Sequence, residues 1–239
     1  MKSLSIILPT YNEAGNIANL IKTIYVEIKK INLKPQFIVV DDNSPDGTAK
    51  IASQLRKKLP VKVLIRKNEK GLATAILHGI KNSKSDLIVL MDADFNHKPQ
   101  DVPWLLQPIL KSKVDIVIGS RYIPGGGMHI TEANKFQFFL SKNGNFFVNR
   151  ILLNLPVHES LSGFVAFKRT ILDNLNVNKI FQGYGEYCIQ LLYKSHRRGV
   201  KIVEVPVIYG RRRWGQSKSK LIKMAINYFK TAVLLRLDR

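Results

Sequence analysis

Two aspartates one residue apart follow an apolar run in the stretch 87-LIVLMDADFNHKP-99. The apolar residues Leu87 to Met91 indicate a buried strand, which ends at Asp92 and Asp94. Side chains two positions apart in extended backbone point the same way, and paired like charges raise each other's pKa unless a cation lies nearby. A hard divalent ion such as Mg²⁺ or Mn²⁺ accepts one or two carboxylates and completes its shell with water and substrate phosphates. The alternative is that one aspartate caps the next helix and the other is solvated.

Polar clusters also follow two other predicted strands. One is 9-PTYNE-13, and the other is 41-DDNSPDGT-48, whose Ser44-Pro45-Asp46-Gly47 suits a turn and a helix start. Asp41 and Asp42 are in excess of what that turn requires. Ligands of open α/β sheets bind beyond the carboxyl ends of the strands, so three such clusters predict a nucleotide and its metal at one edge.

Familiar nucleotide-binding and metal-binding motifs are missing from the sequence. It has no GxxxxGK[ST] loop and no GxGxxG between a strand and a helix, and its five histidines lack metal-ligand spacing. His97 lies beside the aspartate pair, and a helix-start or solvated role is favoured for it over a role in the site. The lone Cys188 has no catalytic signature and rules out an internal disulfide, which fits a reducing compartment.

The order of apolar patterns predicts the fold. Short apolar runs at 4–9, 37–41, 61–65, 87–91 and 114–119 alternate with helical patterns at about 13–30, 46–58, 71–83 and 101–111. Uninterrupted apolar strands between helices are typical of a mostly parallel, doubly wound α/β sheet. A helix near 134–154, a strand at 160–167, a helix near 186–198 and a strand at 201–207 are expected next. We expect a catalytic domain over 1–210 and a basic loop with an amphipathic helix over 211–239.

The charge of the chain is extreme, with 38 Lys and Arg against 17 Asp and Glu, or +21. This balance predicts attraction to polyanions. A nucleic-acid-binding module is not favoured, because it leaves the aspartate clusters unexplained. No apolar run approaches the roughly 20 residues of a membrane span. The first residues do not form a signal peptide, since Pro9 ends a short apolar stretch, and a cytoplasmic protein is expected.

Eight motifs occur in a familiar order: PTYNE, VVDDNSPDGT, EKGLATA, MDADFNHKP, IGSRY, LSGF, EVPV and RRRWGQSK. From Ser3 to about Lys220 the chain resembles the inverting family 2 glycosyltransferases of GT-A fold, and among them the dolichyl-phosphate mannose synthases. The resemblance implies a Rossmann-like sheet flanked by helices. It also implies transfer of mannose from GDP-mannose to dolichyl or polyprenyl phosphate. Sister transferases that attach glucose or N-acetylglucosamine from a UDP-sugar remain the alternative.

The resemblance also implies a role for particular residues. Asp92, Asp94 and, in place of a more usual glutamine, Asn96 would hold Mg²⁺ or Mn²⁺. The implied nucleotide-sugar contacts are Pro9, Tyr11, Glu13, Val40, Asp42, Asp92, Ala93, Asp94, Arg212 and Lys218.

Phosphate contacts complete the implied site. Asp94, Arg121 and Arg212 would be catalytic, with Ser217 and Lys218 near the phosphates, and Arg121 and Ser141 would bind the acceptor phosphate. An arginine found one turn before the Ser141-Lys142 pair in similar proteins is replaced here by Gln137, with Lys135 the nearest cation. A lipid monophosphate is already charged near neutral pH, so no catalytic base is required.

Two segments have the composition of a membrane surface contact. Residues 217–236 place Lys220, Lys223, Asn227 and Lys230 along one side of a helix with a broad apolar remainder. The aromatic-rich segment 134–154 combines five phenylalanines with Lys142 and Arg150. The alternative for both is packing on the protein's own sheet. The membrane interpretation predicts a peripheral protein on the cytoplasmic face, with or without a separate membrane-anchoring subunit.

Overall fold

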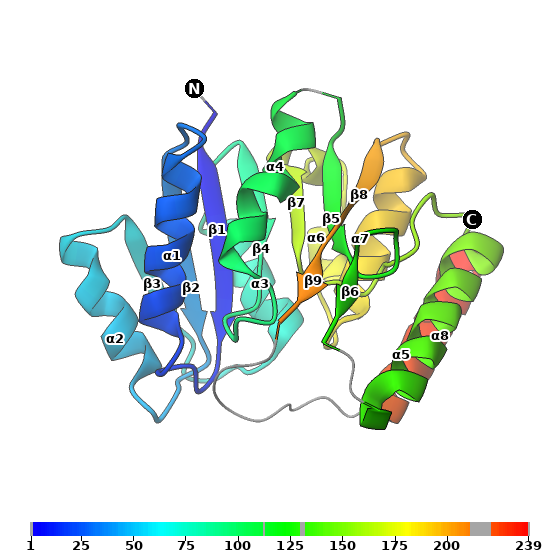
Figure 1. Cartoon of the computed structure of the whole chain (residues 1–239), viewed down its shortest axis with the longest axis horizontal. Helices are drawn as coiled ribbons and strands as arrows, with labels where there is room; N and C mark the ends of the chain where they lie inside the picture. Colours follow the sequence, from blue (N-terminus) through cyan, green and yellow to red (C-terminus); the bar gives the residue numbers. More distant parts are fainter. Residues whose placement is uncertain (1, 112, 130–131, 211–220, 239) are drawn as a thin grey trace.

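The computed structural model describes residues 2–111, 113–129, 132–210 and 221–238 of the chain. Its centre is a seven-stranded sheet of order β3-β2-β1-β4-β7-β5-β8 (Figure 1). The strands are β1 Leu4–Thr10, β2 Pro35–Asp41, β3 Val61–Ile65, β4 Leu87–Leu90, β5 Ile116–Ser120, β7 Val165–Lys168 and β8 Ile202–Pro206. All neighbours are parallel except β7, which runs antiparallel to β4 and β5. The predicted mostly parallel α/β sheet is therefore confirmed.

Helices cover both faces of this sheet, as the uninterrupted apolar strands require. The elements between the strands are α1 Ile17–Lys29, α2 Thr48–Gln54, η1 Leu55–Lys57, α3 Leu72–Lys81, η2 Pro99–Asp101, α4 Val102–Leu110, η4 Arg169–Leu172, α6 Val177–Ile180 and α7 Glu186–His196. Side chains of α1, α2 and α4 pack in the core on one face, and those of α3, α6 and α7 pack on the other. Helix α1 shows how sequence sets this packing, because its buried residues recur three or four positions apart: Ile17, Leu20, Ile21, Ile24 and Ile28.

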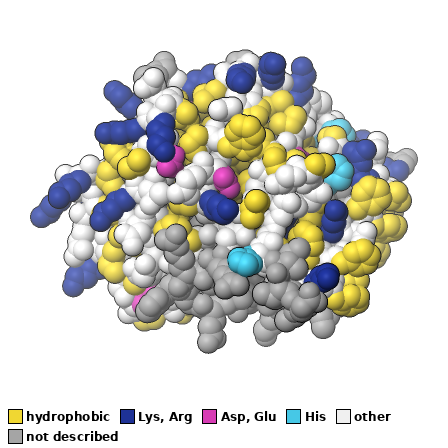
Figure 2. Space-filling view, in the orientation of Figure 1, with side chains coloured by type: hydrophobic (Ala, Val, Ile, Leu, Met, Phe, Trp, Pro, Cys, Tyr) yellow, Lys and Arg dark blue, Asp and Glu magenta, His cyan; other side chains and the backbone are white. Residues whose placement is uncertain are grey.

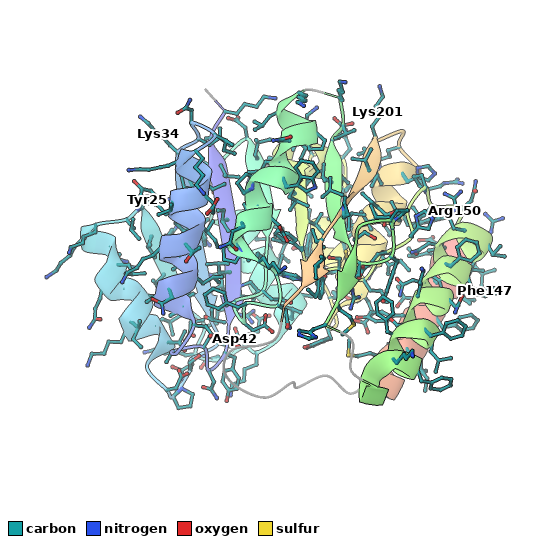
Figure 3. All side chains as sticks on the ribbon, in the orientation of Figure 1. Tyr25, Lys34, Asp42, Phe147, Arg150 and Lys201 are labelled. Atoms are coloured by element: carbon teal, nitrogen blue, oxygen red, sulfur yellow. The ribbon has the colours of Figure 1, made fainter. Side chains whose placement is uncertain are left out.

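The parallel strands end together at one edge of the sheet. Figure 3 labels Asp42, which follows β2, at the edge opposite to Lys34 and Lys201, which precede β2 and β8. A short two-stranded sheet, β6 Gly127–Met128 with β9 Ile208–Tyr209, lies beyond the ends of β5 and β8. The carboxyl-end edge is thus where the three polar clusters of the sequence meet.

Two elements differ in detail from their prediction. The strand expected over 160–167 begins only at Val165, because side chains bind the preceding backbone. Asn145 accepts a hydrogen bond from the N–H of Ser160, and the Ser162 hydroxyl accepts one from the N–H of Phe164. The helix expected near 134–154 is α5, Glu132–Phe146, which continues as a π-helix, η3, over Phe147–Leu152.

Helix α8, Leu221–Leu237, contacts α7 and η3 at the end of the sheet. It buries Ala232 and Leu235 in the core. Among the described helices, none combines the length and the apolar character needed to cross a bilayer. The division at residue 210 stays a prediction, because residues 211–220 lie outside the described parts of the chain.

The outer side of α5, η3 and α8 carries ten exposed large apolar side chains, which we call the apolar face. They are Phe136, Phe139, Leu140, Phe146, Phe147, Ile151, Ile226, Phe229, Leu234 and Leu237. Hydrophobic side chains gather over this part of the molecule in Figure 2, and Phe147 and Arg150 point outward in Figure 3. Exposed apolar side chains that gather on one part of a surface are typical of an interaction site. Helix α8 shows that such exposure is compatible with packing of its other side in the core.

Candidate active site

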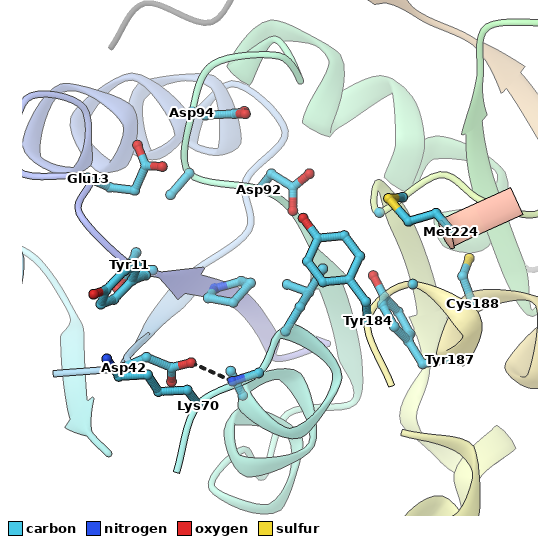
Figure 4. Close-up of a pocket in the computed structure, with 18 of the residues that line it drawn as sticks. Tyr11, Glu13, Asp42, Lys70, Asp92, Asp94, Tyr184, Tyr187, Cys188 and Met224 are labelled. Atoms are coloured by element: carbon cyan, nitrogen blue, oxygen red, sulfur yellow. Dashed lines mark hydrogen bonds between the residues drawn. The ribbon is translucent and has the colours of Figure 1, made fainter. Parts of the chain in front are cut away.

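A cavity of about 380 Å³ opens at the carboxyl-end edge of the sheet (Figure 4). Most of the residues predicted to bind a nucleotide-sugar line it, namely Pro9, Tyr11, Glu13, Asp42, Asp92, Ala93 and Asp94. Val40 does not. It is fully buried in β2, where its methyl group packs against the helix glycine Gly79.

The two aspartates of the loop after β4 both reach this cavity. Their carboxylates extend toward the same side in Figure 4, as expected for positions two residues apart. Asp94 is buried and accepts hydrogen bonds from the Asn96 N–H at 3.0 Å and from the Asn96 Nδ2 at 2.8 Å. Asn96 therefore braces Asp94 through its nitrogen atoms, and its role as a metal ligand stays a prediction.

His97 contacts the same loop after β4 through a backbone hydrogen bond. Its Nδ1 accepts a hydrogen bond from the Asp92 N–H at 3.3 Å, and its ring stacks on Phe164 at 5.0 Å and meets Tyr209 edge-on at 4.7 Å. Burial lowers the pKa of His97 to about 4, the Asp94 charge raises it in part, and Arg121 lowers it further. The imidazole is thus neutral at pH 7. The solvated role expected for His97 is wrong, since its side chain is buried between two aromatic rings, and the helix-start role stays a prediction.

Asp42 is fixed by a buried arginine that sequence reasoning missed. Its Oδ1 accepts a hydrogen bond from Arg66 Nε at 2.7 Å, and its Oδ2 accepts one from the Gly71 N–H at 2.8 Å. The other Arg66 nitrogens donate to Thr74 Oγ1 and to the Gly71 carbonyl, both at 2.8 Å. The Asp42–Arg66 pair therefore anchors the loop before α3 to the end of β2 (Figure 4 draws the Asp42–Gly71 bond).

Asp41, the residue before Asp42, forms hydrogen bonds within the turn after β2. Asp41 is fully buried and accepts hydrogen bonds from Thr10 Oγ1 and from both the N–H and the hydroxyl of Ser44. Asp46 accepts bonds from the Thr48 N–H and hydroxyl and from the Ala14 N–H, which lower the pKa of its carboxyl against the raising effect of burial. Asp41 is thus part of the turn, not in excess of it.

Arg121 forms a buried ion pair with Glu159. Its Nε donates to Glu159 Oε1 at 2.8 Å, its Nη2 donates to the same oxygen, and its N–H donates to Oε2 at 2.6 Å. Burial lowers the pKa of the guanidinium, but the Glu159 charge outweighs that effect and the net pKa is raised. The guanidinium also lies 4.5 Å from the Tyr209 ring centroid. Arg121 does not line the cavity in this arrangement, so its contact with an acceptor phosphate stays a prediction.

The remaining predicted contacts lie elsewhere. Ser141 Oγ hydrogen-bonds the Tyr122 hydroxyl at 2.7 Å, beside a second, smaller cavity of about 250 Å³ near α5. Arg212, Ser217 and Lys218 lie outside the described residues, and their roles stay predictions.

Several lining residues carried no sequence signal strong enough to select them. Tyr184, Tyr187, Met224 and Tyr228 reach the cavity from α7, its preceding loop and α8, and Lys70 reaches it from the loop before α3. Of these five residues, only Lys70 belongs to a motif recognised in the sequence, EKGLATA. The others follow from packing of distant helices, which no local pattern encodes.

Comparison with known proteins agrees with this geometry. The model of the family "Glycosyl transferase family 2" matches residues 5–175, which include every strand up to β7 and both aspartates. The chain belongs to glycosyl transferase family 2.

Curated relatives of this glycosyltransferase are similar over most of its length. It is 38% identical over 219 residues to a dolichol-phosphate mannosyltransferase of Pyrococcus furiosus, which covers 91% of this chain and 59% of the relative. It is 32% identical to a polyprenol monophosphomannose synthase of Mycolicibacterium smegmatis, with 98% of this chain and 88% of the relative covered. The chain thus spans less than two thirds of the Pyrococcus furiosus protein.

Solved structures support the fold of the glycosyltransferase. A glucosyl-3-phosphoglycerate synthase of Mycobacterium tuberculosis, in complex with Mn²⁺, uridine-diphosphate-glucose and glycerol 3-phosphate, matches with a TM-score of 0.67. The identity is 21%, and the match covers 98% of this chain and 80% of that protein. At this identity the likeness concerns the fold alone.

The glycosyltransferase has the oxygen donors that a hard divalent cation needs. Asp92 and Asp94 line one cavity and supply carboxylates, and Mg²⁺-type ions bind through one or two carboxylates with substrate phosphates and water. The described residues contain no group of three or more His, Cys, Asp or Glu side chains that would form a cage on their own. The donor set therefore fits a cation shared with a nucleotide diphosphate.

Glu186, at the start of α7, does not line the cavity and is therefore not positioned to act as a base there. Glu186 Oε2 accepts hydrogen bonds from the N–H groups of Tyr184 and Gly185, at 2.7 and 2.9 Å. Nearby, burial raises the pKa of Tyr187 and Cys188 far enough that both stay protonated at neutral pH. Tyr187 and Cys188 are therefore not ionised at neutral pH, and the carboxylates that line the cavity are those of Glu13, Asp42, Asp92 and Asp94.

Proposed function

We propose that the protein transfers mannose from GDP-mannose to the phosphate of a dolichyl or other polyprenyl lipid, with inversion at the sugar carbon. The relatives named above support the sugar and the acceptor class. The structural observation that carries the proposal is that the cavity and the apolar face share one helix. Helix α8 lines the cavity with Met224 and Tyr228 and exposes Ile226 and Phe229 on its other side. An acceptor with a charged head and a hydrocarbon tail fits this combination.

The residues of the chain act by position and charge. Asp92 and Asp94 would hold a Mg²⁺ or Mn²⁺ ion, which when bound neutralises charge on the departing nucleoside diphosphate. His97, held by Phe164 and Tyr209, keeps the backbone of Asp92 in place. The acceptor phosphate needs no base, because its second ionisation lies near pH 6 and its oxygen is already anionic. Positioning two bound reactants is then the main task of the protein.

The apolar face supports attachment to the cytoplasmic surface of a bilayer. Lys142, Arg150 and Lys230 accompany its aromatic side chains, and the whole chain carries a charge of +21. Each basic residue near an anionic lipid surface contributes about 1 kcal/mol of attraction. A separate membrane subunit would cover the same surface, so binding of the purified protein alone to vesicles tests direct attachment.

The vesicle experiment uses phosphatidylcholine vesicles with and without phosphatidylglycerol. We expect the wild type to sediment with anionic vesicles, and Phe139→Ser with Phe147→Ser to weaken binding by up to about a thousandfold, since each buried aromatic contributes about 2 kcal/mol. The matched control is Val26→Ser, because Val26 is equally exposed on α1, far along the chain from the apolar face. Equal binding of the control and the double variant would count against direct attachment.

The activity experiment supplies radiolabelled GDP-mannose, UDP-glucose and UDP-N-acetylglucosamine with dolichyl or undecaprenyl phosphate. We expect mannose in the lipid fraction and its loss in excess chelator. Faster transfer from a UDP-sugar would overturn the assignment of the donor, and full transfer in chelator would overturn that of the cation.

A further inference from the structure

The cavity has two chemically different ends. One end carries the charged side chains of Glu13, Asp42, Lys70 and Asp94, and Asp92 lies between this end and Tyr184 (Figure 4). The other end, which we call the tyrosine end, is lined by Leu161, Tyr184, Tyr187, Met224 and Tyr228. Among the described lining residues, none at the tyrosine end carries a formal charge, so this end suits hydrocarbon better than a diphosphate.

Helix α8 connects the tyrosine end to the apolar face. Met224 and Tyr228 lie one turn apart and line the cavity, whereas Ile226, Phe229 and Leu237 are exposed on the outer side. An α-helix with its side chains is about 10 Å across, so the two surfaces are separated by the width of one helix. A lipid whose tail lies on the apolar face would have to pass around α8, over the width of one helix, to place its first carbons at the tyrosine end.

A close contact between α7 and α8 sets the depth of this end. A Cβ added to Gly185 would lie 2.1 Å from the Tyr228 hydroxyl and 3.1 Å from its ring carbon Cζ. The backbone of Gly185 has φ −122°, which any residue adopts, so only the approach of Tyr228 requires a glycine here. Tyr228 thus closes the end of the cavity against the start of α7.

We propose that the tyrosine end is a subsite for the isoprene unit next to the acceptor phosphate, and that the Tyr228–Gly185 contact determines which isoprenyl phosphates fit. This inference rests on the proposed function for the identity of the acceptor, and it adds the residues that select it. Tyr228 and Gly185 are specificity-determining positions in this scheme. The reacting groups lie at the charged end.

The test measures binding without any sugar donor. Calorimetry would compare citronellyl phosphate, whose first isoprene is saturated, with geranyl phosphate, whose first isoprene is unsaturated, and with inorganic phosphate. In Gly185→Ala the new methyl group displaces Tyr228. We expect the affinity for whichever of the two isoprenyl phosphates the wild type binds more tightly to fall about tenfold, which is the usual effect of one misplaced methyl group in an apolar pocket. Affinity for inorganic phosphate and for GDP should change much less.

A second variant makes the steric argument specific. Tyr228→Phe removes the oxygen that lies 2.1 Å from the added Cβ, leaving Cζ at 3.1 Å as the nearest atom. The double variant Gly185→Ala with Tyr228→Phe should therefore recover most of the lost affinity. Gly144→Ala is the matched control, because an added Cβ there meets no atom within 4 Å. Thermal unfolding of each variant, followed by circular dichroism, shows whether it is folded.

The outcomes separate this inference from the proposed function. Loss of GDP affinity equal to the loss of isoprenyl phosphate affinity, or no rescue by Tyr228→Phe in a folded double variant, would overturn the subsite. A wild type that binds isoprenyl phosphates with the expected variant pattern but transfers no mannose would keep the subsite and overturn the proposed function.

Discussion

Replacement of Arg66 by methionine should destabilise the protein strongly, because it removes one partner of a buried ion pair. The Arg66 side chain is 4% exposed and that of Asp42 is 10% exposed. Breaking a buried pair by removing one partner costs about 3–5 kcal/mol, since the remaining charge has no counterion. Thr74 Oγ1 and the Gly71 carbonyl also lose one hydrogen bond each, but the carbonyl keeps those from the Ala75 N–H and the Thr74 hydroxyl, so the ion pair dominates the expected loss.

The free energy of unfolding would be measured by urea denaturation with an unchanged m-value. Arg56→Met is the matched control, since Arg56 is exposed and makes one hydrogen bond, to the Val63 carbonyl at 3.2 Å, and its loss should cost less than about 1 kcal/mol. Adding Asp42→Asn to Arg66→Met removes the unpaired charge and should restore about 2 kcal/mol. A loss for Arg66→Met no larger than for Arg56→Met would refute the reasoning.

The double variant also decides what Asp42 does for the nucleotide. If its only role is to hold the loop through Arg66 and Gly71, the stabilised double variant should bind GDP with nearly normal affinity in calorimetry. If the carboxylate also contacts the ribose, as the family resemblance implies, GDP affinity should fall about tenfold or more, because one hydrogen bond to a charged group contributes about 1.5–3 kcal/mol.

Three further predictions concern pH, metal and the basic loop. His97 has a pKa of about 4 in the folded protein against 6.5 in a solvated reference, so the unfolded chain binds more protons below pH 6.5. The free energy of unfolding should therefore fall as pH drops from 6.5 to 4, by about 3 kcal/mol from this group, and His97→Asn should flatten that slope in urea titrations. Asp94→Asn should abolish mannose transfer while leaving the thermal midpoint within a few degrees, and activity equal to wild type would exclude a role in binding the cation. Arg212→Lys should lower kcat about 100-fold as loss of one transition-state donor does, and equal, near-normal rates for Arg211→Lys, Arg212→Lys and Arg213→Lys would contradict a catalytic role.

The sheet could be predicted from the sequence because its signals are local. Runs such as 61–65 coincide with a strand, β3, and the apolar spacing from Ile17 to Ile28 gave the length of α1 to within a few residues. The place of Asp92 and Asp94 at a strand end also followed from the run before them. These features depend on neighbouring residues alone.

Other features of the site depend on contacts between distant segments. Arg66 meets Asp42 across 24 positions, and Tyr228 meets Gly185 across two helices, so no short motif reports either contact. The neutral state of His97 likewise depends on Phe164 and Tyr209, which reach it from separate parts of the chain. Sequence patterns placed the polar residues at one edge, but they did not tell which of them brace the others.

The reversed direction of β7 has a consequence for how such a protein diversifies. Because β5 ends and β7 begins at the same edge, the 121–164 segment leaves the sheet and returns to it beside the cavity. This segment contains α5 and η3, which supply six of the ten side chains of the apolar face. The outer part of this segment can change in length and surface without altering strand register, whereas its last residues, Leu161 and Gly163, line the cavity. The apolar face can therefore diverge among descendants that keep the same seven-stranded sheet.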